Sequence, residues 1–263
     1  MNDPVTIVTT SYHALPGIRQ LAKEQAAVLE CHFIDRGNSS ILTLLTNYGA
    51  HCLLVYTNNG PELVTVQGRH YFHLGMAQLR IEQLDHGGED YFAEALGTRD
   101  DASLLDCTLG FGSDAIVASF VLGKGSVITG LESSLGMATV TAWGLANFTH
   151  DNPAVTVAMR RIKVCRKNYN QYLTNRDGKK YDIIYFDPMF NCPIAESSQF
   201  KAMRPLLNHD QLTAAHIDRA LAKANKRVII KGRNFTSLQR LYPQVKIIGG
   251  TYSSIKYAVL EQI

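Results

Sequence analysis

The sequence predicts an α/β protein in which a small α+β unit precedes a doubly wound, Rossmann-like parallel sheet of seven strands. From about residue 104 onward, short β-branched or apolar runs alternate with longer helical stretches, as a parallel sheet with crossover helices requires. The chain has 263 residues, 46% of them hydrophobic, which suffices for one or two domains with a buried core. Residues 1 to about 75 lack the alternation and contain a hairpin signal. We therefore expect two domains, 1–75 and 76–263.

The expected N-terminal unit opens with a strand at 6–10 and a helix from Pro16 to residue 29. Two apolar runs, 51–57 and 62–67, flank the turn sequence Asn58-Asn59-Gly60 and predict a β-hairpin. Residues 77–97 predict two short helices, broken at His86-Gly87-Gly88, that lead into the larger domain.

Apolar runs in the larger domain predict seven strands, at 104–108, 126–131, 162–166, 181–187, 227–231, 245–248 and 257–261. Helices are expected between them, at 113–122, 135–148, 209–225 and 236–241. The last two strands follow each other without a long helical crossover. The final strand can therefore enter antiparallel, as an edge hairpin.

Charge is divided unevenly along the chain. Residues 1–134 contain 7 Lys+Arg and 15 Asp+Glu, whereas residues 135–263 contain 19 and 8. A basic half is a compositional hint of a polyanionic partner such as nucleic acid, and it fits a solvated basic surface equally well. The same two interpretations apply to two groups of basic residues: Arg160, Arg161, Lys163, Arg166 and Lys167, and then Arg176, Lys179 and Lys180.

Neither a membrane segment nor a metal site is expected. The first ten residues lack the basic start and apolar centre of a signal peptide, and the longest strongly apolar stretch, 115–122, is too short for a membrane span, so we expect a cytoplasmic protein. The five cysteines form no CxxC pair. His70 and His73 are three positions apart in an expected strand, where side chains alternate between faces, so they cannot easily bind one metal ion.

The first motif, Asp106-Cys-Thr-Leu-Gly-Phe-Gly-Ser-Asp114, lies where a buried strand turns into a helix. Gly110 and Gly112 allow a tight turn and let a ligand approach the main chain, and the helix start offers free N–H groups. Glu132 ends the next expected strand, 22 positions after Gly110, close to the roughly 20-residue spacing at which an acid binds the ribose of an adenosine. Together they indicate a dinucleotide or S-adenosylmethionine. The alternative is a purely structural turn with Glu132 solvated.

The second motif, Asp187-Pro188-Met189-Phe190, ends an apolar strand and favours S-adenosylmethionine. A nicotinamide enzyme has no evident use for it. At a strand end beside the ligand crevice, the Asp187 carboxylate and the Pro188 carbonyl can accept hydrogen bonds from the amino group of a base and so localise its lone pair. Phe190 can stack on an unstacked or flipped base. The alternative is a capped turn with Phe190 in the core.

At these residues the sequence resembles the bacterial class I methyltransferases that include the small-subunit ribosomal RNA guanine-N2 methyltransferase J. The resemblance covers roughly residues 75–235 and rests on both motifs, on Glu132, on Met203-Arg204 and on Ile229-Ile230-Lys231. It implies a class I methyltransferase sheet and S-adenosylmethionine as cofactor. Residues 191–198 and the N-terminal unit depart from that pattern, so fold and cofactor carry over more safely than the target nucleotide.

The resemblance and the two motifs together assign expected roles to site residues. Contacts to the cofactor are expected from Asp106, Gly110, Gly112, Ser113, Asp114, Glu132, Ser133, Asn168, Tyr169 and Asp187. Asp187, Pro188 and Phe190 are the expected catalytic residues. Substrate contacts are expected from Met189, Phe190, Arg204, Lys231 and Arg233.

The expected activity is methylation of the amino group of a guanine in RNA by direct in-line displacement without a metal, and the resemblance implies that this RNA is ribosomal. Two alternatives stay open on the sequence. One is a methyltransferase of the same fold that acts on DNA, protein or a small molecule. The other is a non-catalytic module that binds adenosine or RNA.

Overall fold

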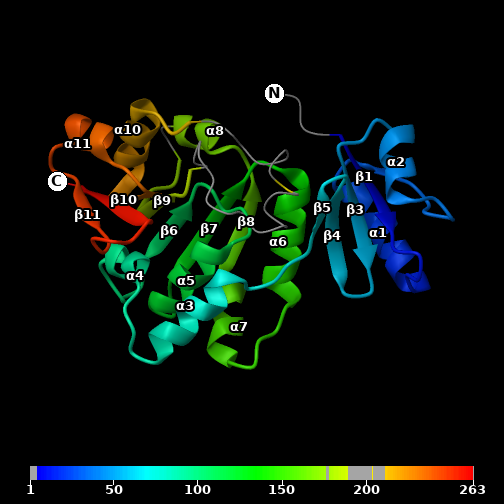
Figure 1. Cartoon of the computed structure of the whole chain (residues 1–263), viewed down its shortest axis with the longest axis horizontal. Coiled ribbons are helices and arrows are strands. Elements are labelled where there is room, and N and C mark those ends of the chain that lie inside the picture. The colour runs from blue at the N-terminus through cyan, green and yellow to red at the C-terminus, as the bar shows by residue number, and fades with distance from the viewer. Residues whose placement is uncertain (1–4, 176–177, 189–202, 204–210, 263) are drawn as a thin grey trace. The chain divides into compact units, whose positions relative to one another are not determined.

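The computed structural model describes residues 5–175, 178–188, 203 and 211–262, and Figure 1 shows the whole chain. The chain divides into two compact units. The smaller unit comprises, among the described ranges, residues 5–73, 133–148 and 203, and the larger unit comprises 74–132, 149–175, 178–188 and 211–262. The helix at 135–147 thus groups with the N-terminal residues. The domain division at residue 75 stays a proposal.

The smaller unit is a five-stranded sheet with helices. Its strand order is β2-β1-β3-β4-β5, with β1 parallel to β2 and β3, and with antiparallel pairs elsewhere. The expected hairpin is confirmed, since Thr57 pairs with Gly60 around the two-residue turn. The sequence did not predict β2 or α2, and the strand expected around His70 and His73 is observed as β5, which ends at His70. The elements are β1 (Thr6–Thr10), α1 (Pro16–Val28), β2 (His32–Phe33), α2 (Ile41–Asn47), β3 (Cys52–Thr57), β4 (Gly60–Thr65), β5 (Gly68–His70) and α6 (Leu135–Asn147).

Helix α6 packs against β3 and β4 because glycines allow a close approach. A Cβ atom added at Gly144 would lie 1.8 Å from Cγ of Phe72, and one added at Gly136 would lie 2.4 Å from Cδ1 of Leu63. Both glycines face the small sheet, eight positions apart on one side of the helix. This fit explains why α6 groups with the N-terminal residues.

Replacement of Gly144 by alanine should therefore destabilise the protein by about 1–3 kcal/mol, since the new methyl group overlaps the Phe72 ring. Gly17→Ala is the matched control, because Gly17 is also helical and an added Cβ meets nothing within 4 Å. Alanine there should be neutral or stabilising by up to about 1 kcal/mol. Urea-induced unfolding measures both changes, and equal effects of the two substitutions would contradict the packing argument.

The larger unit contains the expected seven-stranded sheet, in the order β11-β12-β10-β9-β6-β7-β8. Strands β6 to β10 pair in parallel, and β12 runs antiparallel to both neighbours, as expected for the last strand. The last two strands pair antiparallel with each other and form the expected hairpin at this edge of the sheet, with β12 between β10 and β11 and with β11 outermost. The strands are β6 (Ser103–Asp106), β7 (Val127–Glu132), β8 (Ile162–Arg166), β9 (Tyr181–Phe186), β10 (Ala224–Gly232), β11 (Lys246–Ile248) and β12 (Lys256–Glu261).

Helices cover both faces of this sheet, as the term doubly wound implies (Figure 1). One layer contains α3 (Met76–Asp85), α4 (Tyr91–Leu96), α5 (Ser113–Val121) and α7 (Pro153–Arg160), and the other contains α8 (Tyr169–Thr174), α10 (Ala214–Lys223) and α11 (Thr236–Leu241). The second layer shares a hydrophobic core with the sheet residues Leu105, Ile184 and Val228. The sequence missed α7 and α8. Within the described ranges, every helix is too short or too polar to cross a bilayer.

Helix α10 is shorter than the expected 209–225. It begins after Thr213, whose amide donates to Nδ1 of His216 at 3.1 Å, and the expected positions 209–210 lie outside the described residues. At its other end the chain enters β10 already at Ala224, which the sequence assigned to the helix. Helical spacing of small apolar residues does not by itself separate a helix end from the start of a buried strand.

Candidate active site

The carboxyl ends of four neighbouring strands bring the main site residues together. Asp106 ends β6, Glu132 ends β7, Asp187 directly follows β9, and Lys231 is the penultimate residue of β10. In an open parallel sheet, ligands bind outside these carboxyl ends, where the strand order reverses. Here the chain passes from β6 to β7 on one side and from β9 to β10 on the other.

The glycine turn after β6 has the backbone that its sequence requires. Gly110 and Gly112 have φ angles of +50° and +80°, and Gly112 is the residue before the first turn of α5. The Gly110 amide donates to Oε2 of Glu132 at 3.1 Å, so the acid lies directly beside the turn. A Cβ atom added at Gly110 would meet only the Thr108 carbonyl, at 3.8 Å. This open main chain beside a carboxylate fits an adenosine ligand.

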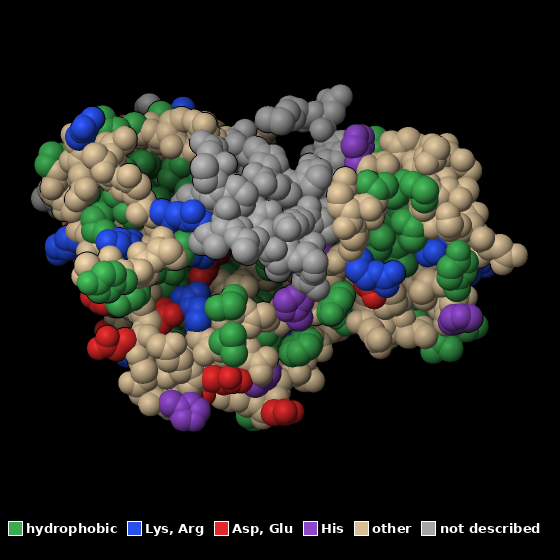
Figure 2. All heavy atoms as spheres, in the orientation of Figure 1, with side chains coloured by type: hydrophobic (Ala, Val, Ile, Leu, Met, Phe, Trp, Pro, Cys, Tyr) green, Lys and Arg blue, Asp and Glu red, His purple; other side chains and the backbone are tan. Residues whose placement is uncertain are grey.

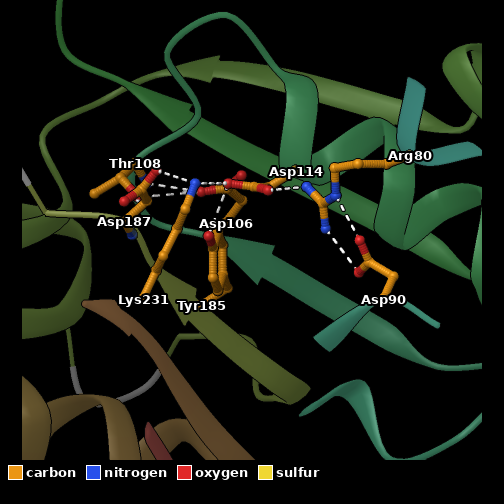
Figure 3. A network of polar contacts seen from close by, with 8 residues as sticks. All are labelled: Arg80, Asp90, Asp106, Thr108, Asp114, Tyr185, Asp187 and Lys231. Atoms are coloured by element: carbon orange, nitrogen blue, oxygen red, sulfur yellow. Dashed lines mark hydrogen bonds and ion pairs between the residues drawn. The ribbon is translucent and has the colours of Figure 1, made fainter. Parts of the chain in front are cut away.

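Asp114, in the first turn of α5, is the centre of a buried polar network (Figure 3). Its Oδ1 accepts from Nη1 of Arg80 at 2.5 Å. Its Oδ2 accepts from the Tyr185 hydroxyl at 2.8 Å and from Nζ of Lys231 at 3.0 Å. Arg80 also binds both carboxylate oxygens of Asp90, at 2.7 and 2.9 Å. The network thus joins α3, α4, α5, β9 and β10.

The two cations determine the charge state of Asp114. Burial alone would raise the pKa of its carboxyl group, but Lys231 and Arg80 hold that pKa well below the usual range. The same ion pairs raise the pKa values of Lys231 and Arg80 against the effect of their burial. At neutral pH this centre therefore consists of an ionised acid between two charged bases.

Two hydrogen bonds hold Asp187 in place, one through its amide and one through its carboxylate. Its amide donates to Oγ1 of Thr108 at 2.7 Å, and its Oδ2 accepts from Nζ of Lys231 at 2.8 Å. Among the described residues, Lys231 is the only donor to this carboxylate, and the side chain is 31% exposed. Burial and the nearby Asp114 raise the pKa of Asp187, while Lys231 acts in the opposite direction. Within the described part of the chain, Oδ1 accepts no hydrogen bond.

Asp106 is a buried acid of a different kind. Its Oδ1 accepts from the Thr108 amide at 2.9 Å, and the residue is 2% exposed. Burial raises its pKa to about 8, with Asp114 and Asp187 acting in the same direction and the Thr108 hydrogen bond opposing them. The folded protein therefore binds a proton at Asp106 near neutral pH.

The raised pKa of Asp106 implies a stability contribution that depends on pH. The unfolded chain releases this proton near pH 4 and the folded chain near pH 8, so the contribution is complete below about pH 4 and is lost as the pH rises to about 8. Asp106→Asn should therefore gain stability relative to the wild type as the pH rises through this window. Each unit of pKa difference corresponds to about 1.4 kcal/mol.

Urea-induced unfolding of both proteins at pH 5, 7 and 9 measures this difference. Asp151→Asn, the same exchange at an exposed acid, is the control. A difference between Asp106→Asn and the wild type that does not change with pH would show that the proton is absent.

The structure places the remaining expected cofactor residues in different settings. Ser113 opens α5, and Ser133 directly follows Glu132. Asn168 caps α8, its Oδ1 accepting from the Asn170 amide at 2.8 Å. The Tyr169 ring is buried edge-on against Phe186, at 5.7 Å between ring centroids. The cofactor contacts of these four residues stay predictions.

The expected substrate residues are only partly described. Pro188 and Arg233 follow β9 and β10, whereas Met189, Phe190 and Arg204 lie outside the described residues. Lys231 is engaged by two acids of the chain itself, so an additional contact to substrate stays a prediction. Within the described ranges, no three His, Cys, Asp or Glu side chains lie close enough to hold a metal ion.

Sequence reasoning missed three parts of this site. Arg80 reaches Asp114 from a helix 34 positions earlier, and no spacing rule covers such a contact. Tyr185 was treated only as part of an apolar strand. Asp90 did carry a signal, because an acid before a short helix is typical of an N-cap, and its Oδ1 indeed accepts from the Ala93 amide.

Residues 38–250 match the family model described as "Putative SAM-dependent methyltransferase". The chain belongs to this family. It is a divergent class I methyltransferase that uses S-adenosylmethionine, and the open glycine turn beside Glu132 is consistent with that cofactor. The dinucleotide alternative is thereby set aside.

The similarity to several known proteins extends over most of the chain. The uncharacterised protein YpiP of Bacillus subtilis is 30% identical over 86% of this chain and 88% of its own length. The ribosomal RNA small subunit methyltransferase J of Thioalkalivibrio sulfidiphilus is 28% identical over 83% of this chain and 85% of its own. The enzyme of the same name from Pseudoalteromonas atlantica is 25% identical over 92% of this chain and 95% of its own.

A solved structure shares the fold. The SAM-dependent methyltransferase NGO1261 from Neisseria gonorrhoeae superposes with a TM-score of 0.62, over 97% of this chain and 95% of that chain. At 16% identity, this similarity supports the class I methyltransferase fold.

Proposed function

We propose that the protein methylates the N2 amino group of a guanine in small-subunit ribosomal RNA. The observation that carries the proposal is the Asp187 carboxylate, which Lys231 holds through Oδ2 while Oδ1 accepts no hydrogen bond from the described residues, and whose amide donates to Thr108, just before the glycine turn. An acceptor at this place suits an amino group as methyl acceptor. Similarity to enzymes named ribosomal RNA small subunit methyltransferase J supports the choice of RNA.

The cofactor supplies an electrophilic methyl group, and the chain supplies the orientation of the nucleophile. An exocyclic base amine is a poor nucleophile because its lone pair is delocalised into the ring. Asp187 Oδ1 and the Pro188 carbonyl accept its two N–H groups and thereby direct the lone pair toward the methyl group. Thr108 and Lys231 keep Asp187 in this position, through its amide and its Oδ2.

Asp187 does not have to act as a strong base in this scheme. Once the methyl group has moved, the amine becomes acidic and its proton can pass to water. The role of the Asp187 carboxylate comes earlier: during methyl transfer it stabilises the positive charge that develops on the amine. This is electrostatic stabilisation by a group already oriented before the reaction.

Methylation of purified RNA tests the proposed function directly. The protein is incubated with methyl-labelled S-adenosylmethionine and, separately, with protein-free small-subunit RNA, assembled small subunits and large-subunit RNA. Digestion to nucleosides should yield labelled N2-methylguanosine from small-subunit RNA only. Label in another nucleoside, or in DNA or protein in place of RNA, would overturn the proposed substrate, and no transfer with intact cofactor binding would favour a non-catalytic module.

Asp187→Ala should lower the single-turnover rate of methyl transfer by about 10²–10³-fold, the usual effect of removing one electrostatic contact to a developing charge. Affinity for S-adenosylmethionine, measured by calorimetry, should change much less. Asp151→Ala, at an exposed acid, is the control and should keep the wild-type rate. A near wild-type rate for Asp187→Ala at saturating cofactor and RNA would refute the mechanism.

Glu132→Ala should weaken S-adenosylmethionine binding by roughly ten- to a hundredfold, because hydrogen bonds to a charged group contribute about 1.5–3 kcal/mol. Glu132→Gln keeps an oxygen for the Gly110 amide, so it should lose less affinity and separate ribose binding from support of the turn. Glu94→Ala, at an exposed glutamate, is the control. Unchanged calorimetric affinity in folded Glu132→Ala would reject the ribose contact.

A further inference from the structure

Two segments of the larger unit differ in charge. Residues 76–101, which form α3 and α4, contain seven Asp+Glu and two Arg, whereas residues 160–180, around β8 and α8, contain eight Lys+Arg and one Asp. On the face that Figure 2 shows, acidic side chains of the larger unit lie mainly over α3, α4 and α7, and basic ones mainly toward α10 and α11. A polyanion would therefore approach from the side of the second layer.

The basic residues in this region are of two kinds: one has a structural role, and others form no ion pair with the described residues. Arg161 donates to the carbonyl groups of Ser119 and Gly123, the latter at 2.6 Å, and so caps the end of α5. Lys163, Lys167 and Lys179 are exposed, and none of them forms an ion pair with any acid in the described part of the chain. Their charges are available to an outside partner.

Two tyrosines connect lysines that are far apart in the sequence. Nζ of Lys167 lies 5.8 Å from the centroid of the Tyr172 ring, on α8, and Nζ of Lys179 lies 5.0 Å from that of Tyr181, which starts β9. The hydroxyl groups of Tyr172 and Tyr181 are hydrogen-bonded at 2.7 Å. The side chains of Tyr172 and the buried Tyr181 thus connect the end of β8 with the start of β9 across α8.

Lys163 belongs to the same side of the edge strand β8. Side chains two positions apart share a face of a strand, so Lys163 lies on the face of Cys165. Cys165 and Tyr172 pack against the same hydrophobic core. We call the surface formed by Lys163, Lys167, Tyr172 and Lys179 the lysine–tyrosine surface.

This surface begins at the active site. The Lys167 amide donates to the Glu132 carbonyl at 3.0 Å, so the lysine lies beside the strand end that carries the proposed ribose acid. From there the surface continues along β8 and α8 toward the start of β9. A strand of RNA whose base occupies the site could therefore extend directly over these lysines.

We propose that the sugar–phosphate backbone next to the target guanine binds along the lysine–tyrosine surface, with Lys163, Lys167 and Lys179 neutralising phosphates. The inference rests on the proposed function in one respect, that the substrate is RNA. Because no ion pair among the described residues has to be broken, each phosphate contact would release counterions at full effect. The acidic layer of α3 and α4 on the opposite face disfavours a backbone path on that side.

The salt dependence of RNA binding tests this surface. Lys167→Gln and Lys179→Gln are compared with the wild type for binding to protein-free small-subunit ribosomal RNA between about 50 and 200 mM salt. Over this range, counterion release makes the affinity of a protein for nucleic acid fall steeply with salt. Each substitution should reduce the slope of log Kd against log salt by about 0.7–0.9, and the double variant by about twice as much. Lys124→Gln removes an exposed lysine between α5 and β7 and should leave the slope unchanged.

Two further readouts keep the failures distinguishable. Affinity for S-adenosylmethionine should be unchanged in both lysine variants, which separates RNA docking from damage to the site. Wild-type slopes for Lys167→Gln and Lys179→Gln, in a protein that methylates RNA, would overturn the surface and leave the proposed function intact. Absence of any RNA binding or RNA methylation by the wild type would overturn both, and an equal slope change for Lys124→Gln would show that the effect is only net charge.

Discussion

The buried carboxylate of Asp114 is the constraint on which the site depends. Removing a carboxylate from water costs several kcal/mol unless donors replace its hydration, and here the donors come from three different elements. Arg80 on α3, Tyr185 on β9 and Lys231 on β10 must all be in place for this acid to be tolerated. Since Asp114 stands two residues after Gly112, the same contacts fix where α5 begins and therefore the shape of the glycine turn.

Lys231 transmits this constraint to the reacting side of the site. One ammonium group lies between two carboxylates, at 3.0 Å from Asp114 and 2.8 Å from Asp187. Asp114 has two further donors, whereas Asp187 has only this one among the described residues. The two acids consequently differ in their partners: Asp114 stays ionised with three donors, whereas Oδ1 of Asp187 accepts no hydrogen bond from the described residues. A shared cation thus links a fully hydrogen-bonded acid to the acid that we propose as the acceptor for the substrate amine.

Sequence reasoning was most successful where hydrophobic periodicity and glycine chemistry act locally. The bounds of β1, β8 and α11 were predicted to the residue, and Asp106, Glu132 and Asp187 do end or follow neighbouring strands. Prediction from the sequence failed where tertiary packing determines the structure. Asn152 and Pro153 are a start signal for helix α7, but only three residues of the helix are buried. The contact of Arg80 with Asp114 depends on how α3 crosses α5, which no local pattern encodes.

The position of β12 has a consequence for how the larger unit can assemble. β10 and β11 precede β12 in the chain, yet they pair with β12 and not with each other. While the polypeptide is being made, β10 therefore exposes an open row of backbone donors and acceptors until residues 256–261 arrive, and such an edge can recruit foreign strands. The sheet therefore stays incomplete until residues 256–261 have been made, and the nascent chain exposes this edge to aggregation until then.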